Sequence, residues 1–386
     1  MELFSQPHLD FLGKKFIFVG LSTFLVVGSL VLLSTKGLQY GIDFRGGADV
    51  VVRFVQEPSI DEIRAALRKE GFAGAQIQRL ILPGDTQVHD VLIRVPPEED
   101  SEKESDVSGK VIAALRNGLG STKLPPDKVD INITGQVELR ADLLKAYPGR
   151  ETMVARDAQA ITSFRDTHSG IFHSVDEVTK VSGLSPETIA WVKQNIVVGG
   201  FAIRSADYVG PSVGRELKLK ATYAVIGALM VMLVYIWLRF KRLAFGVAAI
   251  VTLAHDAIVA LGAVSFTGKE FDLTVLAAVL TVVGYSINDT IVIFDRVREN
   301  VRQRRGLKLE ALFNESINQT LSRTVLTTML VLLVVVTLWL FGGSRLNPFA
   351  FTLLVGAITG TYSTIYVASP LVVWWRTFID KKPTAA

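Results

Sequence analysis

Apolar residues are distributed very unevenly along this chain. Six stretches are long enough to cross the roughly 30 Å hydrocarbon core of a bilayer as helices, which takes about 20 residues each. They cover residues 16–35, 221–238, 243–268, 272–294, 324–344 and 346–375. The segment 36–220 contains no comparable stretch. The pattern predicts a multi-pass α-helical membrane protein of six spans, with one large domain between the first and second spans.

For the first stretch, 16–35, the alternative is a cleaved signal peptide. The stretch is longer than the usual apolar core of such a peptide, and it has no clear small-x-small cleavage site before Lys36. We therefore expect residues 16–35 to remain in the protein as its first membrane helix.

Lysine and arginine residues in the short connections predict the orientation, because they concentrate on the cytoplasmic side of membrane proteins. With a cytoplasmic N-terminus (1–15), 15 basic residues lie inside, against only Lys269 and Arg345 in the short outer loops. The inner residues are Lys14, Lys15, Arg239, Lys241, Arg242, Arg296, Arg298, Arg302, Arg304, Arg305, Lys308, Arg323, Arg376, Lys381 and Lys382. We expect both termini, including the tail 376–386, and the basic loop 295–323 to be cytoplasmic. The domain 36–220 is then periplasmic.

The first part of this outer domain has the pattern of a soluble α+β fold. Ser59 is a suitable N-cap with Glu62 three residues later, and Gly71 is a suitable helix stop. The order strand, helix, strand, strand, helix, strand predicts a ferredoxin-like sandwich. The expected strands are 48–55, 75–81, 89–95 and 128–137, the expected helices are 59–71 and 107–118, and a Pro-Gly-Asp turn (83–85) and a polar acidic segment (97–106) connect them.

Residues 138–200 form a helical insert in this domain. A helix pair at 173–194 resembles a helix-hairpin-helix unit, a motif often seen in DNA binding, but its turn, Gly183-Leu184-Ser185, lacks the second glycine. A membrane-anchored DNA-uptake protein would need a basic face there. Acidic residues accompany the lysines instead: Asp176, Glu177 and Glu187 beside Lys180 and Lys193. We expect a packed helix pair and no nucleic-acid partner.

Composition agrees with a membrane protein, since 49% of the residues are hydrophobic and only 20% are charged. The chain has no cysteine, which excludes disulfides, thiolate metal sites and a cysteine nucleophile. The net charge of +4 comes from basic residues beside the spans, so it indicates orientation rather than nucleic-acid binding. No nucleophile–base pair or metal-ligand cluster stands out. We expect neither an enzyme nor a cofactor.

Two glycine-rich motifs flank the outer domain where it joins the first and second spans. A strand rather than a helix follows the first motif, so no helix N-terminus is available there to bind a phosphate. Turns with close backbone approach are one interpretation, and hinges are the other. The residues concerned are Gly41, Asp43, Gly46 and Gly47 in GIDFRGG, and Gly210, Pro211 and Gly214 in VGPSVGREL.

Ionisable residues within the spans are candidates for function, because an aspartate in mid-helix costs about 2.5–3.5 kcal/mol on insertion. Asp289 and Asn288 share a predicted polar stripe with Thr281 and Tyr285, which we expect to face away from lipid. Hydrogen bonding between helices, worth about 0.6 kcal/mol per bond, is the structural alternative. Interhelical hydrogen bonding explains Asn288. It does not by itself explain an aspartate at position 289, because an asparagine there would bond equally well.

Asp289 is therefore the candidate proton carrier. Arg323, at the start of the fifth span, is a cation, and a change in its distance from Asp289 would change the proton affinity of Asp289. For the adjacent His255 and Asp256, a place in the proton path and a buried structural pair both remain open. Asp295 is expected to be an anchor or a salt bridge at the cytoplasmic edge.

The stretch GYSINDTIVIFDRVREN (284–300) resembles the SecD/SecF family of bacterial protein-export membrane proteins. The two glycine motifs, the His-Asp pair (255–256) and Ser-Arg-Thr (322–324) agree with this resemblance, which covers the chain except for about 138–200. The helical insert departs from the shorter outer domain associated with the family.

This resemblance implies one half of a twelve-helix bundle of the resistance-nodulation-division (RND) type, completed by SecD in the bacterial inner membrane. It implies proton-driven assistance to the Sec translocation channel, with outer domains that bind the translocating polypeptide. Asp289 would carry the proton, which is the coupling ion, and Arg323 would modulate it. The alternative is a half-size RND-like exporter of a lipid or small molecule, but such exporters carry a second six-helix half in the same chain.

Overall fold

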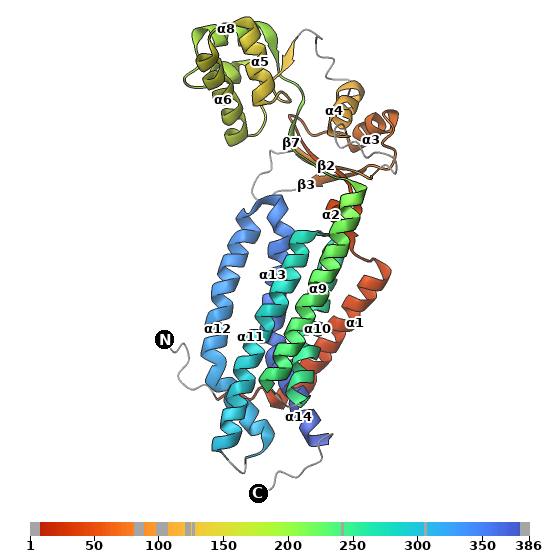
Figure 1. Ribbon diagram of the computed structural model, residues 1–386, viewed down its shortest axis with the longest axis vertical. Helices are drawn as coiled ribbons and strands as arrows, with labels where there is room; N and C mark the ends of the chain where they lie inside the picture. The colour runs from red at the N-terminus through yellow and green to blue at the C-terminus, as the bar shows by residue number, and fades with distance from the viewer. Residues whose placement is uncertain are drawn as a thin grey trace. The chain divides into compact units, whose positions relative to one another are not determined.

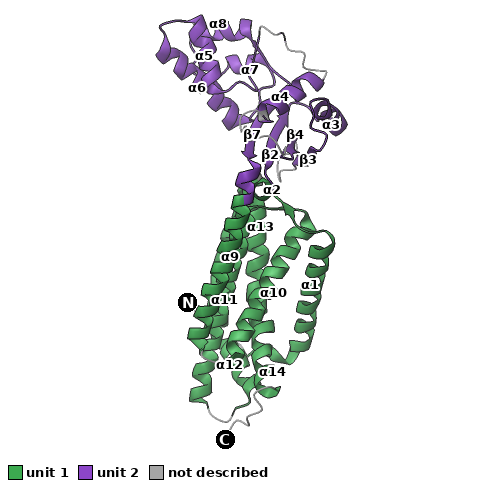
Figure 2. Ribbon diagram, turned by 45° about the vertical axis from the view of Figure 1, so that its right-hand side comes forward, with its two compact units in different colours: residues 1–44, 216–386 green, residues 45–215 purple. Residues whose placement is uncertain are grey.

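The computed structural model describes residues 8–80, 89–97, 107–119, 125, 128–240, 243–304 and 307–378 (Figure 1). The expected turn at 83–85, nearly all of the acidic segment 97–106 and the tail after 378 lie outside the described residues. The chain divides into two compact units (Figure 2). We call residues 1–44 and 216–386 the helical unit and residues 45–215 the α/β unit.

Six helical segments of the described chain are long and apolar enough to cross a membrane. The first is α1 (Lys15–Thr35), which continues a short turn, η1 (Leu12–Lys14). The next four are α9 (Pro211–Phe240), α10 (Leu243–Thr267), α11 (Leu273–Gln303) and α12 (Leu309–Phe341). The last consists of α13 (Gly343–Ser363), a π-helical turn, η2 (Thr364–Ala368), and α14 (Ser369–Phe378).

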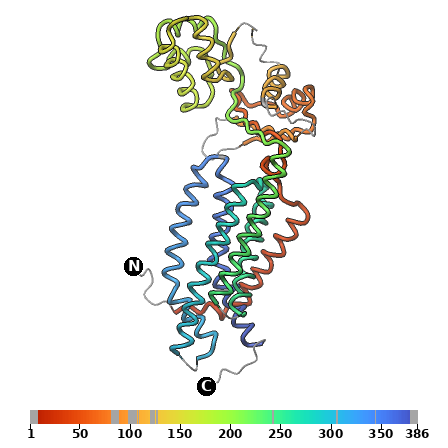
Figure 3. The backbone as a smooth tube through the Cα atoms, in the orientation of Figure 1, coloured from red at the N-terminus to blue at the C-terminus, as the bar shows by residue number. Residues whose placement is uncertain are grey.

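Helix α13 packs against α10, α11 and α12, and α1 lies beside α10 despite its distance in sequence (Figure 3). Glycines permit the close approach of α13 to α11. A Cβ atom added at Gly360 would lie 3.1 Å from the Cβ of Ser286, and one added at Gly356 would collide with Val282. Small residues at such positions let the backbones of membrane helices pack closely.

The last span contains two prolines. Pro348 lies inside α13, and Pro370 is the second residue of α14, directly after the π-helical turn. Proline has no N–H to bond the preceding turn. The wider turn at η2 accommodates the missing backbone hydrogen bond at Pro370, and the hydroxyl of Ser369 donates to the carbonyl of Thr364 at 3.0 Å. The span therefore remains helical throughout.

A four-stranded antiparallel sheet forms the first part of the α/β unit, with the order β3-β4-β2-β7. Its strands are β2 (Gly47–Phe54), β3 (Gln76–Leu80), β4 (His89–Val95) and β7 (Phe201–Val209). Helices α3 (Ile60–Lys69) and α4 (Val107–Gly118) cover one face (Figure 1). The expected caps of α3 are confirmed: Ser59 Oγ accepts the backbone N–H of Glu62, and Gly71 has a φ of +91°.

The strand expected at 128–137 is wrong. Only β5 (Val129–Asp130) forms there, and it pairs with β6 (Ile196–Val197) in a separate two-stranded sheet. The Asp130 carboxylate accepts the N–H groups of Asn132 and Gly199, both at 3.0 Å, which turns the chain away from an extended path. The fourth strand of the main sheet is β7, after the insert, which pairs along the whole of β2.

The insert between β5 and β6 has a core of its own, which includes Leu139, Val154, Ile161 and Phe172. Its helices are α5 (Gln136–Ala146), α6 (Glu151–His168), α7 (Val175–Thr179) and α8 (Pro186–Asn195). As expected, α7 and α8 form a packed pair.

One buried carboxylate organises the insert. Asp157 is 0% exposed and accepts hydrogen bonds from the N–H of Ser185 (3.0 Å), the hydroxyl of Ser185 (2.6 Å) and the hydroxyl of Thr188 (2.8 Å). Burial raises the pKa of this carboxyl, but the hydrogen bonds outweigh burial, so its pKa lies below the ordinary value. Asp157 thus fixes the N-terminus of α8 to α6 in its charged form.

Candidate functional site

The centre of the helical unit holds a polar cluster where α10, α11 and α13 meet. Asp256 on α10 is 0% exposed. Its Oδ2 atom accepts hydrogen bonds from the hydroxyl of Ser286 on α11, at 2.5 Å, and from the hydroxyl of Ser363 on α13, at 2.9 Å. One carboxylate therefore joins three membrane helices.

His255 extends this cluster toward α1. Its Nδ1 atom lies 2.9 Å from Oδ1 of Asp256, and its ring lies beside that of Tyr362. The Nε2 atom is buried and has no hydrogen-bond partner among the described residues. A carboxylate bonded to one imidazole nitrogen orients the ring and favours one tautomer. The structure thus brings His255 and Asp256 together as a buried dyad.

Asp289 lies one turn further along α11 from Ser286 and is only 3% exposed. Its Oδ2 atom is buried without a hydrogen-bond partner in the described part of the chain. An ionised carboxylate in such a position is costly, and protonation removes the cost. Asp289 is therefore suited to exchange a proton when its surroundings change.

Hydroxyl groups line the neighbouring turns of the same helices. The hydroxyl of Tyr285 donates to Thr328 on α12 at 2.8 Å, and Thr328 is 2.9 Å from the hydroxyl of Thr361 on α13. Thr290 on α11 meets Thr364 at 3.0 Å, in the π-helical turn. Such turns occur frequently at functional sites. The interior near Asp289 is thus unusually polar for a membrane bundle.

Arg323 is on α12, and its side chain is exposed. No ion pair or hydrogen bond of its guanidinium occurs among the described residues. Arg323 and Asp289 therefore form no ion pair, and their electrostatic interaction depends on the distance between α11 and α12.

The residues of the predicted polar stripe on α11 differ in exposure. Thr281 and Asn288 lie on an exposed face, whereas Ser286 and Asp289 are buried on another. Thr281 and Asn288 are two turns apart and share a face, but Ser286 falls between them on the opposite side of the helix. The buried serine had not been identified as a partner of Asp256, because only the packing of α10 on α11 shows it.

Asp295 differs from Asp289 in its environment. It is about one third exposed and forms ion pairs with Arg239 and with Arg298, the latter at 3.7 Å. This arrangement fits the expected salt bridge at the edge of the bundle, and it makes Asp295 a natural control for Asp289.

The first glycine motif caps the helix that carries Asp289. Oδ2 of Asp43 accepts the backbone N–H of Leu273 at 3.0 Å, and Asp272 accepts that of Val275 at 2.7 Å, so two carboxylates occupy the N-terminus of α11. Gly41 lies close by, because a Cβ atom there would be 3.1 Å from that of Asp272. The capping role of Asp43 was missed, since no local pattern links it to a helix 230 residues away.

This arrangement is reinforced by a small parallel sheet of β1 (Gln39–Tyr40) and β8 (Glu270–Phe271). The rings of Tyr40, Phe271 and Phe44 pack together, with Phe44 in the short helix α2 (Ile42–Arg45). The segment that follows α1 is therefore tied firmly to the start of α11.

The remaining motif glycines lie in the α/β unit and bring two backbones together. A Cβ atom at Gly46 would lie 3.1 Å from the Cα of Pro211, and one at Gly214 would lie 3.0 Å from the N atom of Gly46. Gly47 has a φ of +111°, and a Cβ atom there would collide with the carbonyl of Val95. Close approach explains these glycines, except Gly210, where the nearest atoms to an added Cβ lie at 4.0 Å, an ordinary van der Waals contact. Their action as hinges stays a prediction.

Comparisons with known proteins agree with this structure. Residues 191–378 match the family described as protein export membrane protein SecD/SecF, C-terminal, and residues 31–57 match the SecD/SecF GG motif. The protein translocase subunit SecF of Koribacter versatilis is 37% identical over 400 residues, covering 100% of this chain and 96% of the relative. The SecF subunit of Escherichia coli O157:H7 is 32% identical, covering 94% of this chain and 87% of the relative.

Two solved structures have the same fold. The crystal structure of SecDF from Thermus, a translocon-associated membrane protein, is 29% identical with a TM-score of 0.66, over 96% of this chain and 39% of that one. SecDF in a super-membrane-facing form is 30% identical with a TM-score of 0.55, over 98% of this chain and 40% of that one. This chain thus spans about two fifths of the SecDF chains and nearly all of its SecF relatives. The protein is a multi-pass helical membrane protein that belongs to the SecD/SecF family, among the SecF proteins.

Proposed function

We propose that the protein is a SecF-type accessory subunit of the Sec translocase, which pairs with SecD and uses the proton motive force to promote late steps of protein export. One observation carries the proposal: Asp289, 3% exposed and with an unpaired Oδ2, lies in a membrane-spanning helix within the sequence shared with the family. The role requires proton binding and movement but no chemical catalysis, cofactor or metal.

The proposed cycle depends on the surroundings of Asp289. Protonation neutralises the buried carboxyl, and approach of the Arg323 guanidinium favours its release of the proton. One charge that crosses a potential of about 150 mV supplies roughly 3.5 kcal/mol, which is enough to bias two conformations of the bundle. His255 and Asp256 belong to the same proton path in this proposal, since their dyad contacts α11 through Ser286.

The exposed polar face of the helical unit supports SecD as the partner. Thr281, Asn288 and Arg323 are all exposed on α11 and α12. Polar groups and a guanidinium facing hydrocarbon are costly, so a second protein half is the suitable cover. The SecDF chains, of which this chain covers 39% and 40%, contain additional sequence for such a half.

The further assignments follow the charge distribution and the topology. Both termini are cytoplasmic, the membrane is the bacterial inner membrane, and the α/β unit is periplasmic. The unit is of the ferredoxin-like type, supported by the order β2-α3-β3-β4-α4-β7 and the sheet order β3-β4-β2-β7. It binds the translocating polypeptide near the Sec translocation channel. Its movements depend on the glycine-rich junctions at 41–47 and 210–214.

Replacement of Asp289 tests the proposal in proteoliposomes that contain the chain, SecD and the Sec channel. Asp289→Asn is expected to assemble normally and to abolish the part of export that depends on the proton gradient, because asparagine does not titrate. Arg323→Ala is expected to impair the same step. Asp295→Asn is the matched control and should retain the gradient effect, since Asp295 is partly exposed and paired with basic residues.

Gradient-dependent export at the parental rate by the Asp289→Asn protein would refute the mechanism. Loss of the effect in both aspartate variants, with normal assembly, would show that the assay detects damage to α11 rather than proton exchange at Asp289.

A further inference from the structure

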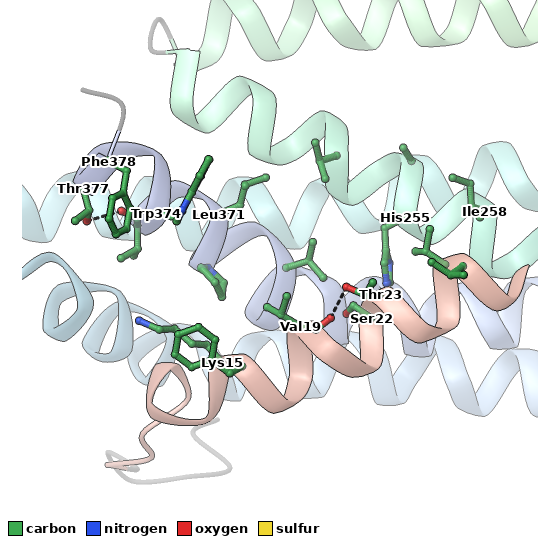
Figure 4. A pocket seen from close by; sticks show the side chains of 18 of the residues that line it. Lys15, Val19, Ser22, Thr23, His255, Ile258, Leu371, Trp374, Thr377 and Phe378 are labelled. Atoms are coloured by element: carbon green, nitrogen blue, oxygen red, sulfur yellow. Dashed lines mark hydrogen bonds between the residues drawn. The ribbon is translucent and has the colours of Figure 1, made fainter. Parts of the chain in front are cut away.

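Helices α1 and α10 are in close contact at one level of the bundle. Both run toward the small sheet of β1 and β8, so they are parallel. Gly262 of α10 lies against Ser29 of α1, where an added Cβ atom would collide with the serine and where Ser29 is only 7% exposed. Seven residues earlier on each helix are His255 and Ser22, which lie near each other in Figure 4.

A groove between α1, α10 and α14 includes this level and has a volume of about 920 Å³ (Figure 4). Its walls are largely aliphatic and aromatic. They include Val19 of α1, Ala254 and Ile258 of α10, and Leu371 and Trp374 of α14. His255 forms part of the inner wall, and Ser22 and Thr23 lie nearby in the same groove. The groove is thus apolar along most of its length.

One end of the groove is charged. Lys15 and Glu310 line it and form an ion pair, and the exposed Lys14 adjoins them in sequence. The three side chains carry a net charge of +1, from two lysines and one glutamate. Trp374 and Phe378 lie toward this end on α14. Basic and aromatic residues together are typical of the boundary between hydrocarbon and lipid headgroups.

The length of the groove indicates its occupant. On α1 its lining runs from Lys15 to Val27, which at 1.5 Å per residue corresponds to about 18 Å. One leaflet of hydrocarbon is about 15 Å thick, half of the roughly 30 Å core, and a spanning helix needs the full core. A lipid tail of one leaflet therefore matches the groove, whereas a transmembrane helix of a partner would exceed it.

We propose that this groove is a binding site for an anionic phospholipid, with an acyl chain along α1, α10 and α14 and the phosphate beside Lys14 and Lys15. A basic residue near an anionic lipid surface contributes about 1 kcal/mol, which corresponds to about a fivefold preference over a zwitterionic lipid. Asp289 does not line this site, whereas His255, which belongs to the proposed proton path, forms part of its inner wall.

Quenching of a single tryptophan by brominated lipids tests this site in reconstituted full-length protein. The chain has five tryptophans, and one variant keeps only Trp374, in the groove, while a matched variant keeps only Trp237, which is 71% exposed on α9. The other tryptophans become phenylalanine. Vesicles contain either brominated phosphatidylglycerol or brominated phosphatidylcholine, diluted into the unbrominated lipids.

We expect Trp374 to report about a fivefold preference for phosphatidylglycerol, following the charge argument above, and Trp237 to report almost none. Lys14→Gln together with Lys15→Gln should remove the preference but leave quenching by both lipids. Ala254→Phe should fill the groove and reduce quenching of Trp374 by either lipid, with unchanged helix content by circular dichroism.

Two results would overturn the proposal. Equal quenching of Trp374 by both lipids, unaffected by Ala254→Phe, would show ordinary annular lipid. Failure of every brominated lipid to quench Trp374 while Trp237 is quenched would show that the groove is closed or covered by protein.

Discussion

Removal of the Asp256 carboxylate should loosen the packing of α10 on α11 and α13. Asp256→Ala deletes two interhelical hydrogen bonds, from Ser286 at 2.5 Å and from Ser363 at 2.9 Å. Such bonds in membrane bundles average about 0.6 kcal/mol and reach about 1.7 kcal/mol, so the free energy of unfolding should fall by about 1–3 kcal/mol. The hydroxyl of Ser363 also lies 3.0 Å from the carbonyl of Gly360 and can donate there instead, so most of the loss should arise at Ser286.

Asp256→Asn separates this packing role from proton exchange. Its amide oxygen can still accept from one serine, so we expect the free energy of unfolding to fall by less than about 1 kcal/mol. Because asparagine does not titrate, the same variant should lose part of the gradient-dependent export. Stability is measured by unfolding in mixed micelles of SDS and nonionic detergent, followed by circular dichroism, and export is measured in proteoliposomes.

An Asp256→Ala protein as stable as the parent would refute the idea that this carboxylate holds the three helices together. An Asp256→Asn protein with full gradient-dependent export would leave the dyad a purely structural role.

Two further substitutions test packing, one in each unit. Asp157→Ala should destabilise the insert by about 3 kcal/mol, because Ser185 loses a charged acceptor. As the pKa of Asp157 is lowered, its stabilisation is present above the unfolded pKa of about 3.9 and is lost as the pH falls through the folded value. Urea unfolding followed by Trp191 fluorescence on α8 measures both effects. Gly356→Leu should destabilise the bundle by about 1–3 kcal/mol through its collision with Val282, measured by thermal unfolding in detergent.

Gly356→Leu has a matched control. Gly20→Leu adds the same side chain on α1, where no atom lies within 4 Å of an added Cβ, so it should be nearly neutral. For Asp157, the variant should lack the loss of stability that the parent shows below about pH 4. An equal acid response in parent and variant would contradict the assignment.

The six apolar helices could be predicted from sequence because each is defined by local composition. The lengths of uncharged stretches alone indicate them. The caps of α3 could also be predicted, since Ser59 and Gly71 act within one turn of the helix. The family resemblance, carried by short motifs, was correct as well.

Features set by contacts between distant segments could not be predicted in this way. The closing strand was placed at 128–137, but the pairing partner of β2 comes only after the insert, at Phe201–Val209. Likewise, Ser286, Ser363 and Asp256 lie on three helices, and only their packing shows that one carboxylate serves both hydroxyls. The roles of Asp289 and Arg323 in proton exchange stay predictions.

The cap that Asp43 places on α11 has a mechanical consequence. Suppose that α11 slides along its axis when Asp289 changes charge. Either the hydrogen bond from the Leu273 N–H to the Asp43 carboxylate then breaks, or the segment 39–45 moves with the helix. Strand β2 begins at Gly47, only a few residues after that segment. Axial movement of α11 would then be transmitted to β2 through a connection of only a few residues, without requiring movement of α9.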